Sequence, residues 1–301
     1  MPTTSAVASV CRNSHLQKLE EDVLYHLGIT TKTIDFKKEF GDIKFVFIGG
    51  SDKRIRRFAE NLAKEFGLDA SPHNLAEKGG RYVMFKVGPV LLANHGMGCP
   101  STSILLHELF KLIHYAECKN VTFIRMGTSG GLGIPPGSIV ITTEALDTKL
   151  EPIYEINVLG KSVKRPTALN SALVEELFAI AQNISGAANI VKGKTVCAND
   201  FYEEQARLDG AFCNYTEEEK INYLKQAHNK GARNFEMEST CFAAMCRMAN
   251  VQAAIVCTTL LDRLKSDQVV ITPEEYMRFE ELPTRLIVAF LRKRNAIPNG
   301  Q

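Results

Sequence analysis

The sequence predicts an α/β protein in which helices cover both faces of one sheet. Short apolar runs rich in β-branched residues alternate along the chain with longer amphipathic runs, and this alternation favours strands joined by helices. Several of the short runs end in glycines, which indicates ligand contacts at the carboxyl ends of the strands. With 301 residues, 45% of them hydrophobic, the chain can bury a sizeable core.

Each expected element follows from its local pattern. The strands are short runs dominated by Val, Ile, Leu and Phe, and the helices are longer runs with apolar residues on one side. In chain order we expect a strand at 44–50, a helix at 52–66, strands at 82–87 and 89–94, a helix at 101–116, strands at 121–126 and 138–143, a helix at 168–183, a strand at 189–196, helices at 217–230 and 238–249, a strand at 253–260 and a helix at 273–292.

Composition narrows the class of protein. The formal net charge of +2 argues against nucleic acid as a partner, and no apolar stretch is long enough to predict a membrane span or a secretory signal. The cysteines show no paired CxxC spacing, so we expect reduced thiols, no metal site and a cytoplasmic protein. Without repeats or a linker, residues 21–301 are predicted to form one domain behind a flexible tail at 1–20.

One polar segment, from Asp200 to Gly210, carries an amide and a guanidinium two positions apart. If the segment is extended, Gln205 and Arg207 project from one face. Together they could read a flat ring with carbonyls and an N–H, such as uracil. The alternative is that Arg207 pairs with a neighbouring carboxylate on a loop surface.

A second pattern predicts an anion site. Glycine clusters follow three expected strands, and glycine lets backbone N–H groups approach an anion closely. Gly50, Arg54, Arg125 and Thr128 could form one phosphate pocket, although each glycine pair could also be a simple turn. No P-loop or GxGxxG spacing is present, which favours free phosphate or a small ester. Glu238 could bind a sugar diol, or it could stabilise a helix N-terminus.

Four motifs in a fixed order resemble the uridine phosphorylases, chiefly those of animals: Gly-Gly-Ser-x-x-Arg, Arg-x-Gly-Thr-Ser-Gly-Gly, Phe-Tyr-x-x-Gln-x-Arg-Leu-Asp-Gly and Glu-Met-Glu-Ser. The resemblance spans 22–294. It implies a three-layer sandwich around a mixed, partly barrel-like central sheet flanked by helices. The implied reaction, in pyrimidine nucleoside salvage, is reversible phosphorolysis of uridine to uracil and ribose 1-phosphate. The implied co-substrate is inorganic phosphate, with no cofactor and no metal, and the implied assembly is at least a homodimer.

The resemblance also assigns residue roles. Catalysis falls to Arg207, Gln205 and Arg125. The positions that match phosphate-binding residues are Gly50, Arg54, Arg125 and Thr128. Met237 and Glu238 match ribose-binding residues, and the base-binding matches are Phe201, Gln205 and Arg207. Two further residues would reach in from the partner subunit, His26 toward the ribose 5′-hydroxyl and Arg81 toward phosphate. A single subunit would then lack a complete site.

One position departs from the pattern. Asp262 stands where an asparagine is common in the family, and purine-cleaving relatives use an aspartate in this region to protonate the leaving base. The alternative is that Arg263 neutralises Asp262. The rival functions are a purine nucleoside phosphorylase, a nucleosidase of the same superfamily and a catalytically silent nucleoside-binding paralogue.

Overall fold

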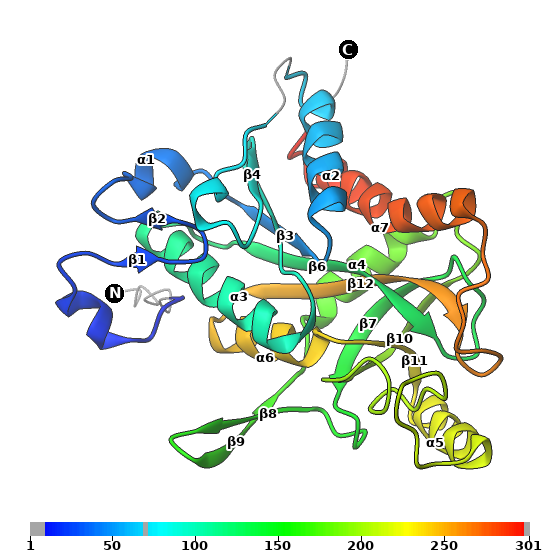
Figure 1. Ribbon diagram of the computed structural model, residues 1–301. Helices are drawn as coiled ribbons and strands as arrows, with labels where there is room; N and C mark the ends of the chain where they lie inside the picture. The colour runs from blue at the N-terminus through cyan, green and yellow to red at the C-terminus, as the bar shows by residue number, and fades with distance from the viewer. Residues whose placement is uncertain (1–9, 69–71, 298–301) are drawn as a thin grey trace, which may run out of the picture.

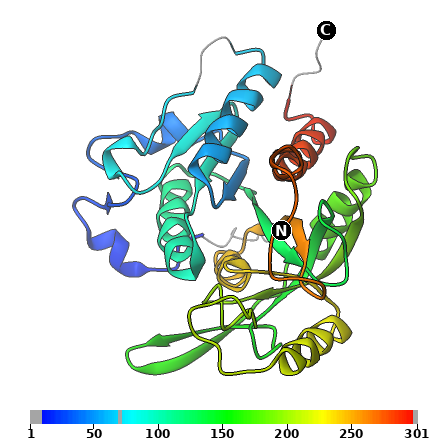
Figure 2. The same ribbon diagram turned by 45° about the vertical axis from the view of Figure 1, so that its right-hand side comes forward.

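The computed structural model describes residues 10–68 and 72–297, and in them helices cover both faces of one mixed sheet (Figures 1 and 2). The eight strands of this sheet lie in the order β11-β10-β7-β12-β6-β3-β5-β4. They are β3 (Phe45–Gly49), β4 (Met84–Val87), β5 (Val90–Asn94), β6 (Thr122–Gly131), β7 (Ile139–Leu146), β10 (Ile190–Cys197), β11 (Ala232–Glu236) and β12 (Gln252–Asp262).

The sheet curls at one end into a barrel-like closure. Strand β11 pairs in parallel with β10 and also in antiparallel fashion with the far end of β6, where Asn234 lies opposite Gly131. Strands β11, β10, β7, β12 and β6 therefore form a closed ring, and β3, β5 and β4 extend it as an open sheet. The predicted mixed, partly barrel-like central sheet is confirmed.

The helices divide between the two faces. One face carries α1 (Phe36–Phe40), α3 (Gly98–Tyr115) and α6 (Ser239–Met248); the other carries α2 (Asp52–Glu65), α4 (Ser171–Ala181) and α7 (Pro273–Lys293). Helix α5 (Glu217–Asn229) packs against β11 beside the barrel. Together the sheet and its two helical covers make the three layers visible in Figure 1.

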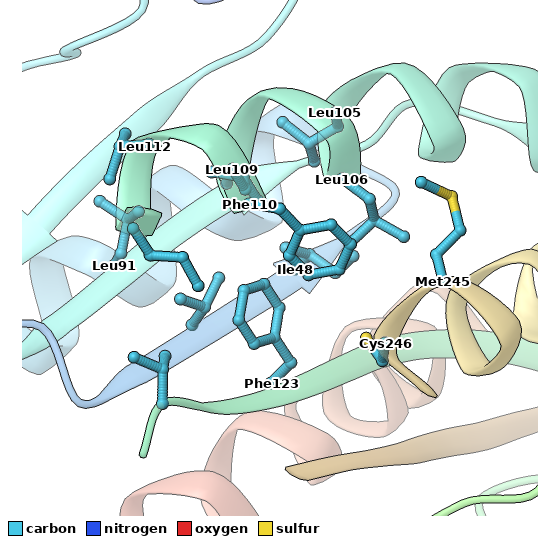
Figure 3. Packing of buried hydrophobic residues seen from close by; sticks show 14 of the residues in the cluster. Ile48, Leu91, Leu105, Leu106, Leu109, Phe110, Leu112, Phe123, Met245 and Cys246 are labelled. Carbon is cyan, nitrogen blue, oxygen red and sulfur yellow. The ribbon is translucent and has the colours of Figure 1, made fainter. Parts of the chain in front are cut away.

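Strand periodicity explains the two cores. Along β3, Val46 and Ile48 belong to the cluster under α3 and α6, whereas Phe47 belongs to the cluster under α2 and α7. Figure 3 shows the first cluster, in which the rings of Phe110 on α3 and Phe123 on β6 lie 5.3 Å apart. A sheet buried on both faces needs continuous apolar runs, which the sequence supplies.

Every predicted strand and helix is present, with ends shifted by a few residues. The sequence reading missed β11, the short pair β1 (Val23–Leu24) and β2 (Ile29–Thr30), helix α1, the 3-10 turns Ser14–Lys18 and Glu77–Gly79, and the hairpin of β8 (Ile153–Val158) and β9 (Lys161–Pro166). Of the predicted tail, residues 1–9 lie outside the described residues. No helix in 10–68 or 72–297 has the length and hydropathy that a bilayer span requires.

Candidate active site

A cavity of about 900 Å³ opens where the carboxyl ends of several strands meet. All but two of the predicted site residues line it: Gly50, Arg54, Arg125, Thr128, Phe201, Gln205, Arg207, Met237 and Glu238. They come from β3, α2, β6, the 200–210 segment and the β11–α6 junction. Residues far apart in the sequence thus line one cavity, because strands from different parts of the chain end at the same edge of the sheet.

One end of the cavity is suited to an anion. A Cβ atom built on Gly50 would lie only 3.1 Å from the carbonyl oxygen of Gly96, so glycine allows this close backbone approach beside the guanidinium of Arg54. Ser51 caps α2 by accepting from the N–H of Arg54. The side chain of Arg54 lies 3.5 Å from a carboxylate oxygen of Glu280 on α7, which holds it beside the cavity.

Arg125 sits between two carboxylates at the centre of the wall. Its side chain is fully buried and contacts Glu236 at 2.8 Å and Glu238 at closer range. Burial raises the pKa of Glu236 even though Arg125 opposes this shift. The other oxygen of Glu238 accepts from the N–H of Gly98 at 2.6 Å. Glu238 is the N-cap residue of α6, but its side chain makes no cap hydrogen bond there, so it is held beside the cavity instead.

The 200–210 segment is built from turns, so the extended conformation that the sequence analysis considered for it does not occur. Ala206 has a φ of 52°, and the N–H of Arg207 donates to the carbonyl of Tyr202. The Asp200 carboxylate accepts backbone N–H groups within the same segment, an arrangement that competes with strand pairing. Gln205 and Arg207 nevertheless both face the cavity, and only 4% and 7% of their surfaces are exposed.

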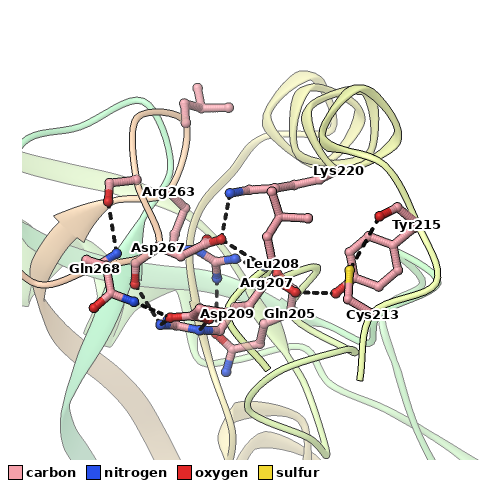
Figure 4. A network of polar contacts seen from close by, with 12 residues as sticks. Gln205, Arg207, Leu208, Asp209, Cys213, Tyr215, Lys220, Arg263, Asp267 and Gln268 are labelled. Carbon is pink, nitrogen blue, oxygen red and sulfur yellow. Dashed lines mark hydrogen bonds and ion pairs between the residues drawn. The ribbon is translucent and has the colours of Figure 1, made fainter. Parts of the chain in front are cut away.

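Arg207 is anchored by an ion pair with Asp209, as the alternative interpretation held, but the guanidinium itself is buried. Its Nε and Nη2 donate to the two oxygens of Asp209, and Nη2 also donates to the carbonyl of Asp267 (Figure 4). Within the described residues, Nη1 is left without a hydrogen-bond partner. The guanidinium carbon lies 4.4 Å from the ring centre of Phe201. Arg207 is therefore held in one orientation with one nitrogen available to a ligand.

Sequence reasoning missed the role of Arg263, which is fully buried and lines the cavity. Its Nη1 and Nη2 donate to the side-chain and backbone oxygens of Gln205, at 3.3 and 2.6 Å. Its Nε donates to Asp267, which also pairs with Lys220 (Figure 4). Because Arg263 occupies the Gln205 oxygen, the amide NH₂ group of Gln205 is the one left for a ligand.

Asp262 behaves differently from both sequence-based expectations. Its carboxylate accepts from the N–H groups of Gly133 and Leu264 and is absent from the cavity wall. The proposed pairing of Asp262 with Arg263 is wrong, because Arg263 turns to Asp267 four residues later. The opposite charges of Arg263 and Asp267, four positions apart, were the feature of the sequence that could have indicated this pair.

The chain is similar in sequence and in structure to known proteins. Residues 44–292 match the phosphorylase superfamily. The chain belongs to this superfamily. It is 47% identical to uridine phosphorylase A of Schistosoma mansoni and 46% identical to inactive uridine phosphorylase B of the same organism, and each alignment covers 95% of this chain and 96% of the relative. A crystal structure of Schistosoma mansoni uridine phosphorylase with uracil superimposes with a TM-score of 0.91 at 46% identity, covering 95% of this chain and all of the other.

Two of the predicted site residues, His26 and Arg81, do not line the cavity of their own chain. His26, between β1 and β2, and Arg81, after the 3-10 turn Glu77–Gly79, are brought to one region by close backbone packing. A Cβ atom on Gly79 would lie 2.0 Å from the carbonyl oxygen of His26, so only glycine fits there. The role of these two residues in a partner's site stays a prediction. No cluster of three or more metal-binding side chains occurs in 10–68 or 72–297.

Proposed function

We propose that this chain is a uridine phosphorylase that converts uridine and phosphate reversibly to uracil and ribose 1-phosphate. The single observation that carries the proposal is the continuity of the cavity. An anion-binding end with Arg54 and Thr128 and an imide-reading end with Gln205 and Arg207 lie in the same space of about 900 Å³. Met237 and Glu238 line the same cavity, and we assign them to the ribose.

The proposed mechanism stabilises two developing charges. As the glycosidic bond lengthens, positive charge grows on the ribose and negative charge on the uracil ring. Nη1 of Arg207 and the NH₂ group of Gln205 are the donors aimed at the base, and both side chains are held by protein partners before substrate arrives. Phosphate near Arg54, Arg125 and Thr128 is then both the counter-charge to the ribose and the nucleophile.

The proposal includes a shared site in a homodimer or a larger assembly. His26 and Arg81 do not line the cavity of their own chain, which supports a contribution to a neighbouring copy. We further propose that the protein works in the cytoplasm in pyrimidine nucleoside salvage, that residues 21–301 act as one domain, and that phosphate is a co-substrate with no cofactor.

A substrate panel tests the function. Purified protein is incubated with uridine, thymidine, inosine and methylthioadenosine, each with and without phosphate, and the released base is separated by chromatography. We expect release of uracil from uridine only when phosphate is present. Activity on inosine with none on uridine would reject the proposal in favour of a purine enzyme, and release without phosphate would indicate a nucleosidase.

A catalytically silent nucleoside-binding protein is the second candidate, because one relative of 46% identity is named an inactive uridine phosphorylase. Overall identity does not separate the two candidates, since an active relative lies at 47%. Every predicted site position of this chain carries a side chain capable of its assigned role, which favours the active enzyme. Calorimetry that detects uridine binding, combined with no uracil release in phosphate, would establish the silent alternative.

A further inference from the structure

We infer that Glu108 is a positioning residue that fixes the tautomer of His26, so that this ring presents a hydrogen-bond acceptor to the hydroxyl of a bound nucleoside. The inference rests on the proposed function for the identity of that hydroxyl, the ribose 5′-hydroxyl in the partner's site. The contacts of Glu108 themselves are independent of it.

The Glu108 carboxylate is dedicated to the His26 turn. It lies on α3, with 6% of the residue exposed, and reaches a segment more than eighty positions earlier in the chain. It accepts from the backbone N–H of His26 at 3.0 Å, from the backbone N–H of Leu27 at 2.9 Å and contacts Nδ1 of the His26 ring at 2.7 Å. No lysine or arginine of the described residues forms a salt bridge with it.

These contacts determine which ring nitrogen carries the proton. A carboxylate has only acceptors, so the nitrogen facing it must donate. Nδ1 of His26 therefore holds a proton, and in the neutral ring Nε2 is left as an acceptor. The His26 side chain is 38% exposed while the Glu108 side chain is 8% exposed, so the anchored edge is buried and the ring stays accessible. A hydroxyl can donate to Nε2, whereas a ligand that offers only acceptors cannot.

An isosteric variant can reverse the tautomer while one oxygen, at the place of Oε2, still accepts from the backbone N–H groups of His26 and Leu27. In Glu108→Gln the amide has one oxygen and one NH₂ group. The N–H of Leu27 can only donate, so the amide oxygen belongs near Leu27 and the NH₂ group near Nδ1 of His26. Nδ1 then becomes the acceptor and Nε2 carries the proton. We expect long-range ¹H–¹⁵N spectra of the full-length protein to show the His26 proton on Nδ1 in the wild type and on Nε2 in the variant.

Kinetics with paired substrates separates positioning from general structure. We expect Glu108→Gln to lower kcat/KM for uridine by up to about tenfold, because protonated Nε2 can no longer accept the proton of the hydroxyl, which must turn and accept instead. For 5′-deoxyuridine, which lacks the hydroxyl, we expect a change of less than about twofold, because this substrate makes no hydrogen bond to Nε2. In a His26→Ala background the same Glu108→Gln change should have no further effect on uridine. Glu117→Gln, a change at an exposed carboxylate just after α3, is the matched control and should alter neither substrate.

The outcomes are distinct. Equal loss on both substrates, or an unchanged His26 tautomer in Glu108→Gln, would overturn the inference. A wild-type protein that does not cleave uridine at all would reject the proposed function, while the spectra would still decide whether Glu108 sets the tautomer.

Discussion

Asp267 is predicted to be the electrostatic anchor of the base-binding end, and Asp267→Asn is the change that tests this. The carboxylate, in a side chain only 8% exposed, pairs with Arg263 at 3.0 Å and Lys220 at 2.8 Å, both of them buried. It also accepts from the N–H of Leu208. Asparagine keeps the shape and one acceptor but removes the negative charge, which leaves two buried cations without their counter-charge.

The expected loss of stability follows from the two buried cations that lose their counter-charge. Removing one partner of a buried ion pair typically destabilises a protein by about 3–5 kcal/mol, because an uncompensated charge stays buried. The retained amide oxygen still meets one donor, so we expect a loss near the lower limit, about 3 kcal/mol. For a domain of this size such a loss lowers the melting temperature by roughly 5 °C. Turnover of uridine should fall as well, because Arg263 holds Gln205 and the Asp267 carbonyl holds Arg207.

Asp262→Asn is the matched control for this variant. Its carboxylate is equally buried and lies five residues away, but the nearest cation, Lys265, is 3.9 Å away on an exposed side chain. Asparagine can still accept from Gly133 and Leu264, so we expect less than about 1 kcal/mol of destabilisation and unchanged preference for uridine. Urea unfolding followed by circular dichroism gives both free energies. The reasoning fails if the two variants unfold alike, or if Asp267→Asn unfolds within about 0.5 kcal/mol of the wild type.

Three further predictions address single residues. Arg207→Ala removes a donor to the developing uracil charge and should lower kcat by about a hundredfold to a thousandfold, measured by uracil release; unchanged turnover would contradict the proposed mechanism. Arg54→Ala should mainly raise the KM for phosphate, by about tenfold, and an increase confined to the KM for uridine would be inconsistent with its place at the anion end. Burial lowers the pKa of His95 well below its usual value, and Arg125 adds to this, so the folded protein stays unprotonated there while the unfolded chain takes up a proton. As the pH falls from 6.5 to 5.5, the free energy of unfolding of the wild type should therefore decrease by about 1 kcal/mol more than that of His95→Gln. Urea unfolding at the two pH values measures both decreases, and equal decreases would refute this prediction.

The sequence predicted the fold well because its main elements carry strong local signals. Strands such as Phe45–Gly49 are continuous apolar runs, and helices such as Asp52–Glu65 have a clear apolar side. Strand β11 was missed because its five residues, Ala232–Glu236, include a cationic and an amide side chain. What makes this segment a strand is pairing with both β10 and β6, which no local pattern records.

The site was predictable in its residue types more than in its internal contacts. The glycine clusters and arginines singled out in the sequence line one cavity, and all of the residues assigned to the chain's own site reach it. The partnership of Arg263 with Gln205 joins positions 58 residues apart, and local sequence cannot show such a contact. The turn at Ala206 is equally a product of context, since alanine has no intrinsic preference for a positive φ.

The charges at the anion end favour a site completed by a second subunit. In the part of the chain that the structure describes, the cations near this end are Arg54, Arg57 and Arg125, and the carboxylates that contact them are Glu236, Glu238 and Glu280. Three cations facing three carboxylates leave no net positive charge for a phosphate dianion. Arg81 of a neighbouring copy would add a further cation to this end. Phosphate affinity should therefore depend on protein concentration in the range where the assembly dissociates. An affinity that stays constant in a demonstrably monomeric variant would show that one chain's charges suffice.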